Sequence, residues 1–295
     1  MTDRTLNRED LEHYEQLGYI VLRDFVEQHE VATLRNEVER LIEHAPVGPG
    51  AATDLAGRRV EDPQDFAFTD LGATNGQVLN RISRPFLHSP IVLRSYGHPR
   101  LLGAAADLYG TGLVPFAESI VIKMPERGAP FAWHQDGTFK SGPASERGVN
   151  FGLYLHRADP HNGCLFVVPE SHRRGQIDLE ALVAEHGPHL PGSIPVEAAP
   201  GDLVIHSRNL VHGSFANNAP DPRVTVYFGF HTRATIENLY TDEHIEERRR
   251  CIGLAIRERG DSGLHPSEIP FRYPVDSDLS PAERDRVLRA PPLAV

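Results

Sequence analysis

The chain has 295 residues and a mass of 32.8 kDa, enough for one large core, and its formal net charge at pH 7 is -11. This acidic balance argues against nucleic acid or an anionic membrane as a partner, and no apolar run approaches the roughly 20 residues of a membrane span. The polar N-terminus does not read as a signal peptide, and two cysteines, Cys164 and Cys251, fit a reducing compartment, so we expect a cytoplasmic protein.

Residues 1–112 are predicted to form a mainly helical scaffold. Asn7 can cap a first helix and Gly18 can end it, because Asn suits an N-cap and Gly suits the residue after a helix. Residues 45–73 are rich in Gly, Pro, Ala and Asp without a clear period, which favours a long surface loop. The regular elements expected here are a helix up to Gly18, a strand over 19–22, and helices over 27–44 and 98–109.

The sequence of residues 113–231 predicts short strands separated by turn residues. Eight strands at this spacing predict a mainly β fold with flanking helices, a cupin-like jelly roll or double-stranded β-helix. The expected strands cover residues 116–124, 131–134, 149–156, 164–168, 194–198, 202–206, 210–215 and 224–231.

Residues 232–295 are predicted to form a helical C-terminal part. One helix is expected over about 239–259, and a capping box at Ser280-Pro-Ala-Glu283 opens a short last helix. No internal repeat and no second domain is evident in the sequence, so we expect residues 1–295 to form a single domain.

A candidate metal site begins with His134 and Asp136, at the end of the expected strand 131–134. Side chains two residues apart in a strand project to the same face, so both could bind one ion. A His-x-Asp triplet also arises by chance, and its support comes from His212 and from Arg223 eleven residues later. Two histidines and one carboxylate suit Fe(II) and leave three coordination positions open.

The third ligand has three candidates, namely His206, His212 and His231. His212 is favoured because it alone precedes Gly-Ser and the strand that carries Arg223. A turn over 217–222 would let the strands holding His212 and Arg223 pair antiparallel, so that both side chains face one cavity. A guanidinium there matches the planar shape of a carboxylate.

Three segments together resemble the phytanoyl-CoA dioxygenase family of Fe(II)/2-oxoglutarate-dependent oxygenases. They are His134-Gln-Asp136, the run Asn-Gly-Cys-Leu-Phe-Val-Val-Pro-Glu-Ser-His over 162–172, and His212-Gly-Ser214 with Arg223 beyond. Residues 11–22 are similar to the opening of the family, so the resemblance spans most of the chain up to residue 231. Each segment is unspecific alone, and their combination is specific.

The resemblance implies that His134, Asp136 and His212 bind ferrous iron, with 2-oxoglutarate and O2 as cosubstrates. It implies that Arg223 pairs with the distal carboxylate of 2-oxoglutarate, with the Ser214 hydroxyl beside it. The implied reaction is hydroxylation, or another oxidation, of an unactivated C–H bond in a small molecule, with bacterial natural-product biosynthesis as the expected setting. Halogenating relatives replace the carboxylate ligand by a small residue, so Asp136 favours oxygenation. We expect a monomer or a weak homo-oligomer.

An alternative on the same fold is a cupin-like metal-binding protein, either a non-redox enzyme or a sensor. Arg223 with Ser214 discriminates between the two, because a non-redox site has no need of a dicarboxylate clamp.

Four other positions carry weaker expectations. Arg81 sits where the family often has a basic residue near the cosubstrate, so it is a candidate cosubstrate contact. Lys140, four residues after Asp136 and near the expected entrance, is a candidate for substrate binding. The family commonly has tryptophan where this chain has Gly152, which predicts extra room in the cavity. Lys123 is expected to be solvent-facing, or to bury its stem while its charged end reaches water, as lysines usually do.

Overall fold

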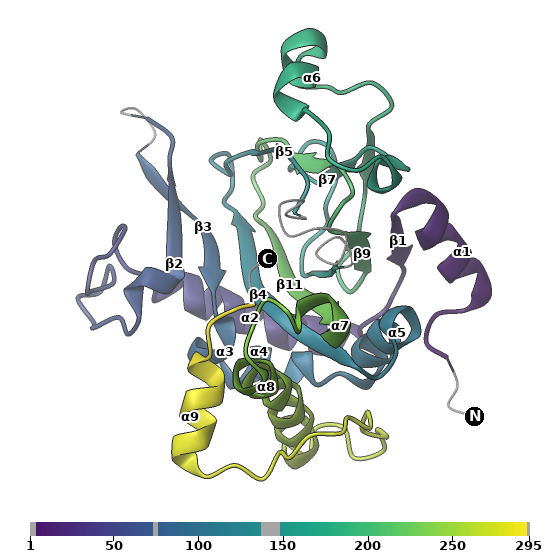
Figure 1. The fold of residues 1–295 in the computed structure, drawn as a ribbon. Coiled ribbons are helices and arrows are strands. Elements are labelled where there is room, and N and C mark those ends of the chain that lie inside the picture. Colours follow the sequence, from purple (N-terminus) through teal and green to yellow (C-terminus); the bar gives the residue numbers. More distant parts are fainter. Residues whose placement is uncertain (1–3, 73–75, 137–147, 294–295) are drawn as a thin grey trace.

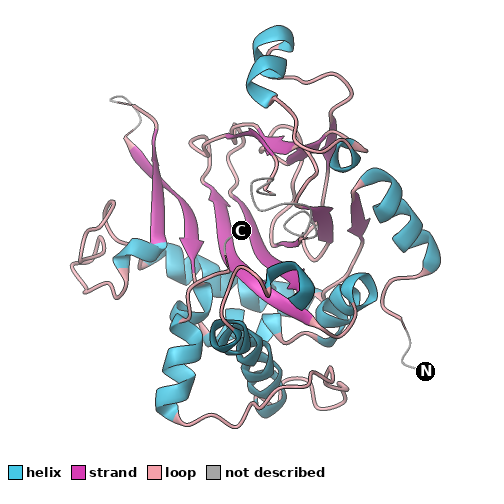
Figure 2. Cartoon of the chain, viewed as in Figure 1, coloured by secondary structure: helices cyan, strands magenta, loops and turns pink. Residues whose placement is uncertain are grey.

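Two antiparallel β-sheets form the centre of the fold in the computed structural model of the chain (Figures 1 and 2). The structure describes residues 4–72, 76–136 and 148–293. The larger sheet has the strand order β1-β9-β6-β11-β4-β3-β2, and the smaller one has the order β5-β10-β7-β8. The strands are β1 Tyr19–Leu22, β2 Phe66–Asp70, β3 Gln77–Ser83, β4 Leu113–Lys123, β5 Phe131–His134, β6 Val149–Tyr154, β7 Leu165–Val167, β8 Ile194–Val196, β9 Leu203–Ser207, β10 His212–Ser214 and β11 Arg223–Thr232.

Every strand expected between residues 113 and 231 is present, within a few residues at each end. The predicted mainly β jelly roll with flanking helices is therefore confirmed. Figure 2 shows these strands at the centre of the molecule, with most helices gathered on one side of them.

The expected pairing of the strands that carry His212 and Arg223 is wrong. β10 pairs with β5 and β7 in the smaller sheet, whereas β11 pairs with β4 and β6 in the larger one. The chain crosses from one sheet to the other between these two strands, as expected for a jelly roll, where consecutive strands often belong to different sheets. Both side chains still line one cavity, because the two sheets face each other across it.

The surface loop expected over 45–73 is only partly confirmed. Its last residues form β2, which pairs with β3 in a hairpin that projects from one edge of the larger sheet (Figure 1). β3 in turn pairs with β4 and places Arg81 opposite Val121. The hairpin was missed because polar and small residues interrupt its apolar pattern.

The helices lie outside the sheets, mostly on one face of the larger sheet (Figure 1). Asn7 accepts a hydrogen bond from the backbone N–H of Asp10, and Gly18 ends this first helix at φ 83°, as predicted. The capping box between Ser280 and Glu283 is also present. The helices are α1 Arg8–Leu17, α2 Gln28–Glu43, α3 Pro85–His88, α4 Pro90–Tyr96, α5 Pro99–Tyr109, α6 Leu179–His186, α7 Arg233–Ile236, α8 Asp242–Asp261 and α9 Pro281–Arg289, with 3-10 turns at Pro63–Asp65 and Ser171–Arg173.

The larger sheet separates the main hydrophobic core from the cavity. On β11, Val224, Val226 and Phe228 are buried in the core that the helices cover. Arg223 and Tyr227 alternate with them and line the cavity on the opposite face. The strand therefore serves both as a core element and as a wall of the site.

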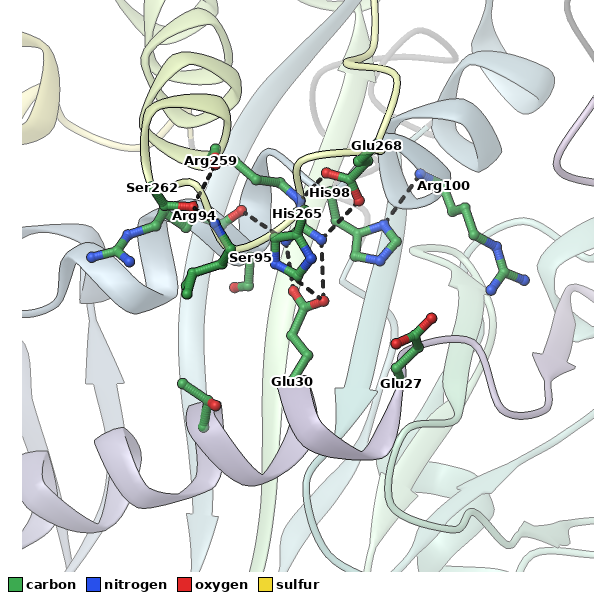
Figure 3. A network of polar contacts seen from close by, with 12 residues as sticks. Glu27, Glu30, Arg94, Ser95, His98, Arg100, Arg259, Ser262, His265 and Glu268 are labelled. Atoms are coloured by element: carbon green, nitrogen blue, oxygen red, sulfur yellow. Dashed lines mark hydrogen bonds and ion pairs between the residues drawn. The ribbon is translucent and has the colours of Figure 1, made fainter.

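A buried ion-pair network fixes the end of α8 against α2 (Figure 3). The guanidinium of Arg259 donates to Glu30 Oε1 at 2.6 Å and to Glu268 Oε2 at 2.5 Å. Its side chain is 4% exposed, so both carboxylates are bound by a largely desolvated cation. This network holds the helical layer in place behind the sheet, and none of its three residues lines the cavity.

Within the described ranges, we find no helix that is both long enough and apolar enough to cross a membrane.

Candidate metal centre and cosubstrate pocket

Three side chains converge on one point, two from paired strands and one from the segment that follows β5. His134 on β5 and His212 on β10 are register partners, and Asp136 follows β5 by two residues. Asp136 Oδ1 lies 3.4 Å from His134 Nε2, and its Oδ2 lies 3.5 Å from His212 Nε2. One ligand atom from each residue lies within 4.8 Å of the others. This donor set fits one metal ion bound on a single face of its coordination sphere.

Both imidazoles are held so that the same nitrogen faces the carboxylate. His134 Nδ1 lies 2.7 Å from the carbonyl of Ala132, and His212 Nδ1 lies 2.8 Å from that of Leu210. A carbonyl can only accept, so each Nδ1 carries the proton and each Nε2 presents a lone pair. Protein groups that hold the second nitrogen in this way are typical of metal-binding histidines.

The charges at the site favour an ionised Asp136 between two imidazoles. Burial opposes its ionisation, but the neighbouring His212 and His134 hold the pKa of this carboxyl well below its usual range. Burial, followed by the proximity of His134, lowers the pKa of His212 to about 4. His212 is thus neutral at neutral pH, the state in which an imidazole can bind a metal.

Asn150 was not singled out in the sequence, although a signal for it existed. Its side-chain amide donates to Asp136 Oδ2 at 2.6 Å and lies 3.1 Å from His206 Nε2. On β6, Val149 and Phe151 are core residues, so the residue between them must face the cavity. The period-2 alternation of 149–153 could therefore have identified it.

His206 is a strand histidine with a hydrogen-bond partner, and it also lines the cavity. Its ring centroid is 4.7 Å from that of His212, and burial lowers its pKa to about 3. The triad with the right geometry contains His212, while His206 occupies the adjoining wall. His231, the other candidate, is buried with its Nε2 3.2 Å from a guanidinium nitrogen of Arg208.

The metal site opens into a cavity of about 240 Å³ between the two sheets. Arg223 lines it and is 2% exposed. Its guanidinium donates to Gly163 O at 2.8 Å and to Thr225 Oγ1 at 3.1 Å. Among the described residues its Nε has no hydrogen-bond partner, so a buried cation here retains an unused donor.

The other expected cosubstrate contacts also lie at this cavity. Ser214 lines it at the end of β10 and is 8% exposed. Arg81 lines it from β3 and remains exposed, so it reaches the mouth of the cavity and not its buried end. Lys140, the candidate for substrate binding, lies outside the described residues.

Two expectations at the cavity wall are wrong. The missing side chain at Gly152 leaves no extra room, because a Cβ there would lie 2.9 Å from the ring of Tyr227, which fills the space. Lys123 is not solvent-facing but 0% exposed. Its Nζ donates to the carbonyls of Ala129 and Phe215, both at 2.6 Å. Lysine composition alone could not reveal this burial, because the acceptors come from distant segments.

Comparisons with known proteins agree with this geometry. Residues 14–225 match the phytanoyl-CoA dioxygenase (PhyH) family. The chain is 26% identical to ectoine dioxygenase of Halomonas elongata, over 86% of this chain and 77% of that protein. It is 28% identical to methylphosphonate hydroxylase of Gimesia maris, over 84% of this chain and 88% of that protein.

Solved structures show the same fold. EctD from S. alaskensis, crystallised with 2-oxoglutarate and 5-hydroxyectoine, superposes with a TM-score of 0.63 at 25% identity. The superposition covers 80% of this chain and 79% of EctD. The carbocyclase SnoK from nogalamycin biosynthesis is 20% identical with a TM-score of 0.59 over 77% of this chain and 85% of SnoK, a likeness of fold alone.

Fold and site together define a non-haem iron oxygenase that uses 2-oxoglutarate as cosubstrate and acts on small molecules. The family match extends over more than half of the sequence, and the chain belongs to the phytanoyl-CoA dioxygenase family. The expected family, enzyme class and cofactors are thereby confirmed, and the alternative of a non-redox cupin or sensor is not supported.

Proposed function

We propose that this oxygenase hydroxylates an unactivated C–H bond of a small molecule, with Fe(II) bound by His134, Asp136 and His212. The observation that carries the proposal is the convergence of two Nε2 atoms and one carboxylate at the cavity. Bound ferrous iron would supply the redox chemistry, coupling reduction of O2 and decarboxylation of 2-oxoglutarate to oxidation of the C–H bond. The protein supplies orientation and a cavity that limits water.

In this proposal the ligands are set before iron arrives. The carbonyls of Ala132 and Leu210 fix the tautomers of the two histidines, and Asn150 fixes the Asp136 carboxylate. Each group is held by a backbone carbonyl or by a strand side chain, so little ordering remains for metal binding to drive.

Arg223 and Ser214 are proposed to bind the distal carboxylate of 2-oxoglutarate. Support comes from the burial of both residues and from the unused Nε donor of Arg223. A charge-assisted pair between a guanidinium and a carboxylate is strong in such a desolvated place. Arg81, at the mouth, is proposed as an outer cosubstrate contact, and Lys140 is retained as a candidate for substrate binding.

The nature of the substrate and the setting are finer proposals. The relatives ectoine dioxygenase and methylphosphonate hydroxylase are named after small polar molecules. We propose that the substrate of this chain is of similar size. We also propose a place in bacterial natural-product biosynthesis, in line with the shared fold of SnoK. A cytoplasmic location is proposed from the two cysteines, which are both buried and unpaired.

The test is formation of succinate from 2-oxoglutarate by the purified chain with Fe(II) and O2. We expect succinate only when all three are present, and none with the His212→Ala variant. Equal succinate formation by that variant would overturn the assignment of the triad. Screening small polar metabolites for a gain of one oxygen atom by mass spectrometry would then identify the substrate.

A further inference from the structure

Two basic side chains lie side by side next to the cavity. Lys123 on β4 is the register partner of Arg223 on β11, and both are almost fully buried. Directly opposed side chains in an antiparallel pair have Cβ atoms roughly 5 Å apart, and like charges in this position destabilise a sheet. A buried pair of this kind needs a counter-charge if both groups are ionised.

Among the residues that the structure describes, the groups around Lys123 are neutral apart from Arg223. Its Nζ donates to Ala129 O and Phe215 O and lies 5.3 Å from the centroid of the Phe131 ring. The titratable groups that act on it are Arg223 and Cys164. Burial raises the pKa of the Cys164 thiol to about 12, so this group carries no charge at neutral pH.

Lys123 also connects the two sheets beside the cosubstrate pocket. Ala129 precedes β5, and Phe215 directly follows Ser214 of β10, so the Nζ of Lys123 joins β4 to the segments next to both ligand-bearing strands. Gly163 makes this approach possible at φ 78°, because a Cβ there would lie 2.4 Å from Phe215 O and 3.0 Å from Lys123 Cδ. The same Gly163 carbonyl accepts from Arg223.

We propose that Lys123 is a positioning residue for the distal carboxylate of 2-oxoglutarate, and that it takes up a proton when that carboxylate binds to Arg223. This inference rests on the proposed role of Arg223. Lys123 does not itself line the cavity. It acts through the electrostatic field that its charge adds to that of Arg223, and through its hydrogen bond to the carbonyl of Phe215, the residue after Ser214. The cosubstrate then supplies the counter-charge that the two cations lack.

The direction of the proton exchange follows from the surroundings of Lys123. Burial, and then the charge of Arg223, lowers the pKa of Lys123 to about 6, so most molecules carry a neutral amine there at pH 7. A carboxylate beside Arg223 offsets its charge and raises the pKa of Lys123. Binding therefore takes up as much as about one proton, and the affinity for 2-oxoglutarate falls as the pH rises above about 6.

The decisive measurement is titration calorimetry on the anaerobic, iron-loaded enzyme at pH 7. Two ligands are compared, 2-oxoglutarate and 2-oxovalerate, which has the same chain length but no distal carboxylate. Running each titration in PIPES and in Tris, which differ in ionisation enthalpy, counts the protons exchanged. We expect 2-oxoglutarate to take up more than about half a proton beyond 2-oxovalerate. Equal uptake with the two ligands would overturn the proposal, and this comparison needs no variant.

Two variants distinguish the effect of the charge on Lys123 from its structural role in joining the two sheets. Lys123→Met should lose the differential proton uptake and bind 2-oxoglutarate about tenfold more weakly, with 2-oxovalerate affinity unchanged. Lys123→Arg keeps a cation that does not titrate, so it should keep the preference for 2-oxoglutarate without proton uptake. A Met variant that weakens both ligands equally would show a structural role only and reject the proposal.

Failure of the underlying function gives a different result. If Arg223 does not bind the distal carboxylate, Arg223→Met will leave the preference for 2-oxoglutarate over 2-oxovalerate unchanged. That outcome would reject the binding of the distal carboxylate by Arg223. If Arg223→Met instead loses the preference for 2-oxoglutarate and Lys123→Met has no effect, only the role of Lys123 is rejected.

Discussion

His134 and His212 lie directly opposite each other on paired strands, with their ring centroids 4.1 Å apart. Each Nδ1 lies within hydrogen-bond distance of the carbonyl two residues earlier in the chain, that of Ala132 on β5 for His134 and that of Leu210, just before β10, for His212. The two imidazoles are therefore fixed by the same local arrangement, and both turn Nε2 toward Asp136. Register between β5 and β10 is what brings the triad together.

Replacing the carboxylate should abolish iron binding. Asp136→Ala leaves two neutral imidazoles without an anionic ligand, and we expect at least about 100-fold weaker Fe(II) affinity and no turnover of 2-oxoglutarate. The single tryptophan, Trp133, adjoins His134, so quenching of its fluorescence reports metal binding. Gln135→Ala is the matched control, because that side chain donates to Gly175 O and Asn209 O and not to the triad. Full turnover in Asp136→Ala would contradict the assignment.

The amide of Asn150 should matter to iron binding without touching the metal. Asn150→Leu keeps the size of the side chain but removes the 2.6 Å hydrogen bond to Asp136. Loss of such an outer contact typically weakens metal binding about 10- to 100-fold. The same Trp133 quenching titration measures this, and an unchanged midpoint would show that the carboxylate needs no such support.

Arg223 should control the affinity for 2-oxoglutarate and leave that for iron nearly unchanged. Removing one partner of a buried charge pair costs about 2–5 kcal/mol, so Arg223→Met should raise the KM for 2-oxoglutarate tens- to thousands-fold. Iron affinity in the absence of cosubstrate, measured in parallel, is the control. An unaltered KM would mean that another cation binds the distal carboxylate.

Local sequence patterns predicted the strands well and the contacts between sheets poorly. Alternation within 149–154 and 223–232 and the turn residues between them predict strands, because period 2 is a local property. The pairing of β10 was wrong because a turn of this length fits a hairpin as well as a crossover between sheets. The triad itself was predictable, since His134 and Asp136 are close in sequence and His212 begins a recognisable motif.

Residues whose role depends on distant backbone could not be found in this way. Lys123 is buried because two carbonyls, from Ala129 and from Phe215, meet at its Nζ. Tyr227 fills the space beside Gly152 because β6 and β11 pair in one particular register. Neither relation has a signature in a single strand, whereas Asn150 did have one in the alternation of its own strand.

A buried ion pair away from the cavity should dominate the stability of the C-terminal helical layer. Arg248 on α8 donates to Glu118 on β4, and the two side chains are 2% and 1% exposed. Glu118→Ala leaves a buried guanidinium unpaired, and we expect the free energy of unfolding to fall by about 3–5 kcal/mol in urea denaturation. Arg8→Ala, which breaks the exposed pair with Glu12, should cost less than about 1 kcal/mol. Similar losses in the two variants would contradict this reading.

Stability should fall in acid partly because His98 is buried in its neutral form. Burial and then the charge of Arg259 lower the pKa of His98 to about 4, against a value near 6.5 in an unfolded chain. Above pH 6.5 both states are neutral and the histidine has no effect on the pH dependence. Between pH 6.5 and 4 only the unfolded chain binds the proton, so the free energy of unfolding falls by about 1.4 kcal/mol per pH unit.

His98→Asn tests this relation without removing the helix cap. His98 is the N-cap of α5, where its Nδ1 accepts from the backbone N–H of Arg100, and Asn is an effective N-cap that does not titrate. From pH 7 to pH 5 the wild type should lose about 2 kcal/mol more stability than this variant in urea denaturation. The matched control is His29→Asn on α2, where the side chain is 67% exposed and the same substitution removes no buried imidazole. Parallel curves for the wild type and His98→Asn would show that acid destabilises the fold through other groups, since the buried imidazole is the only titrating group that this substitution removes.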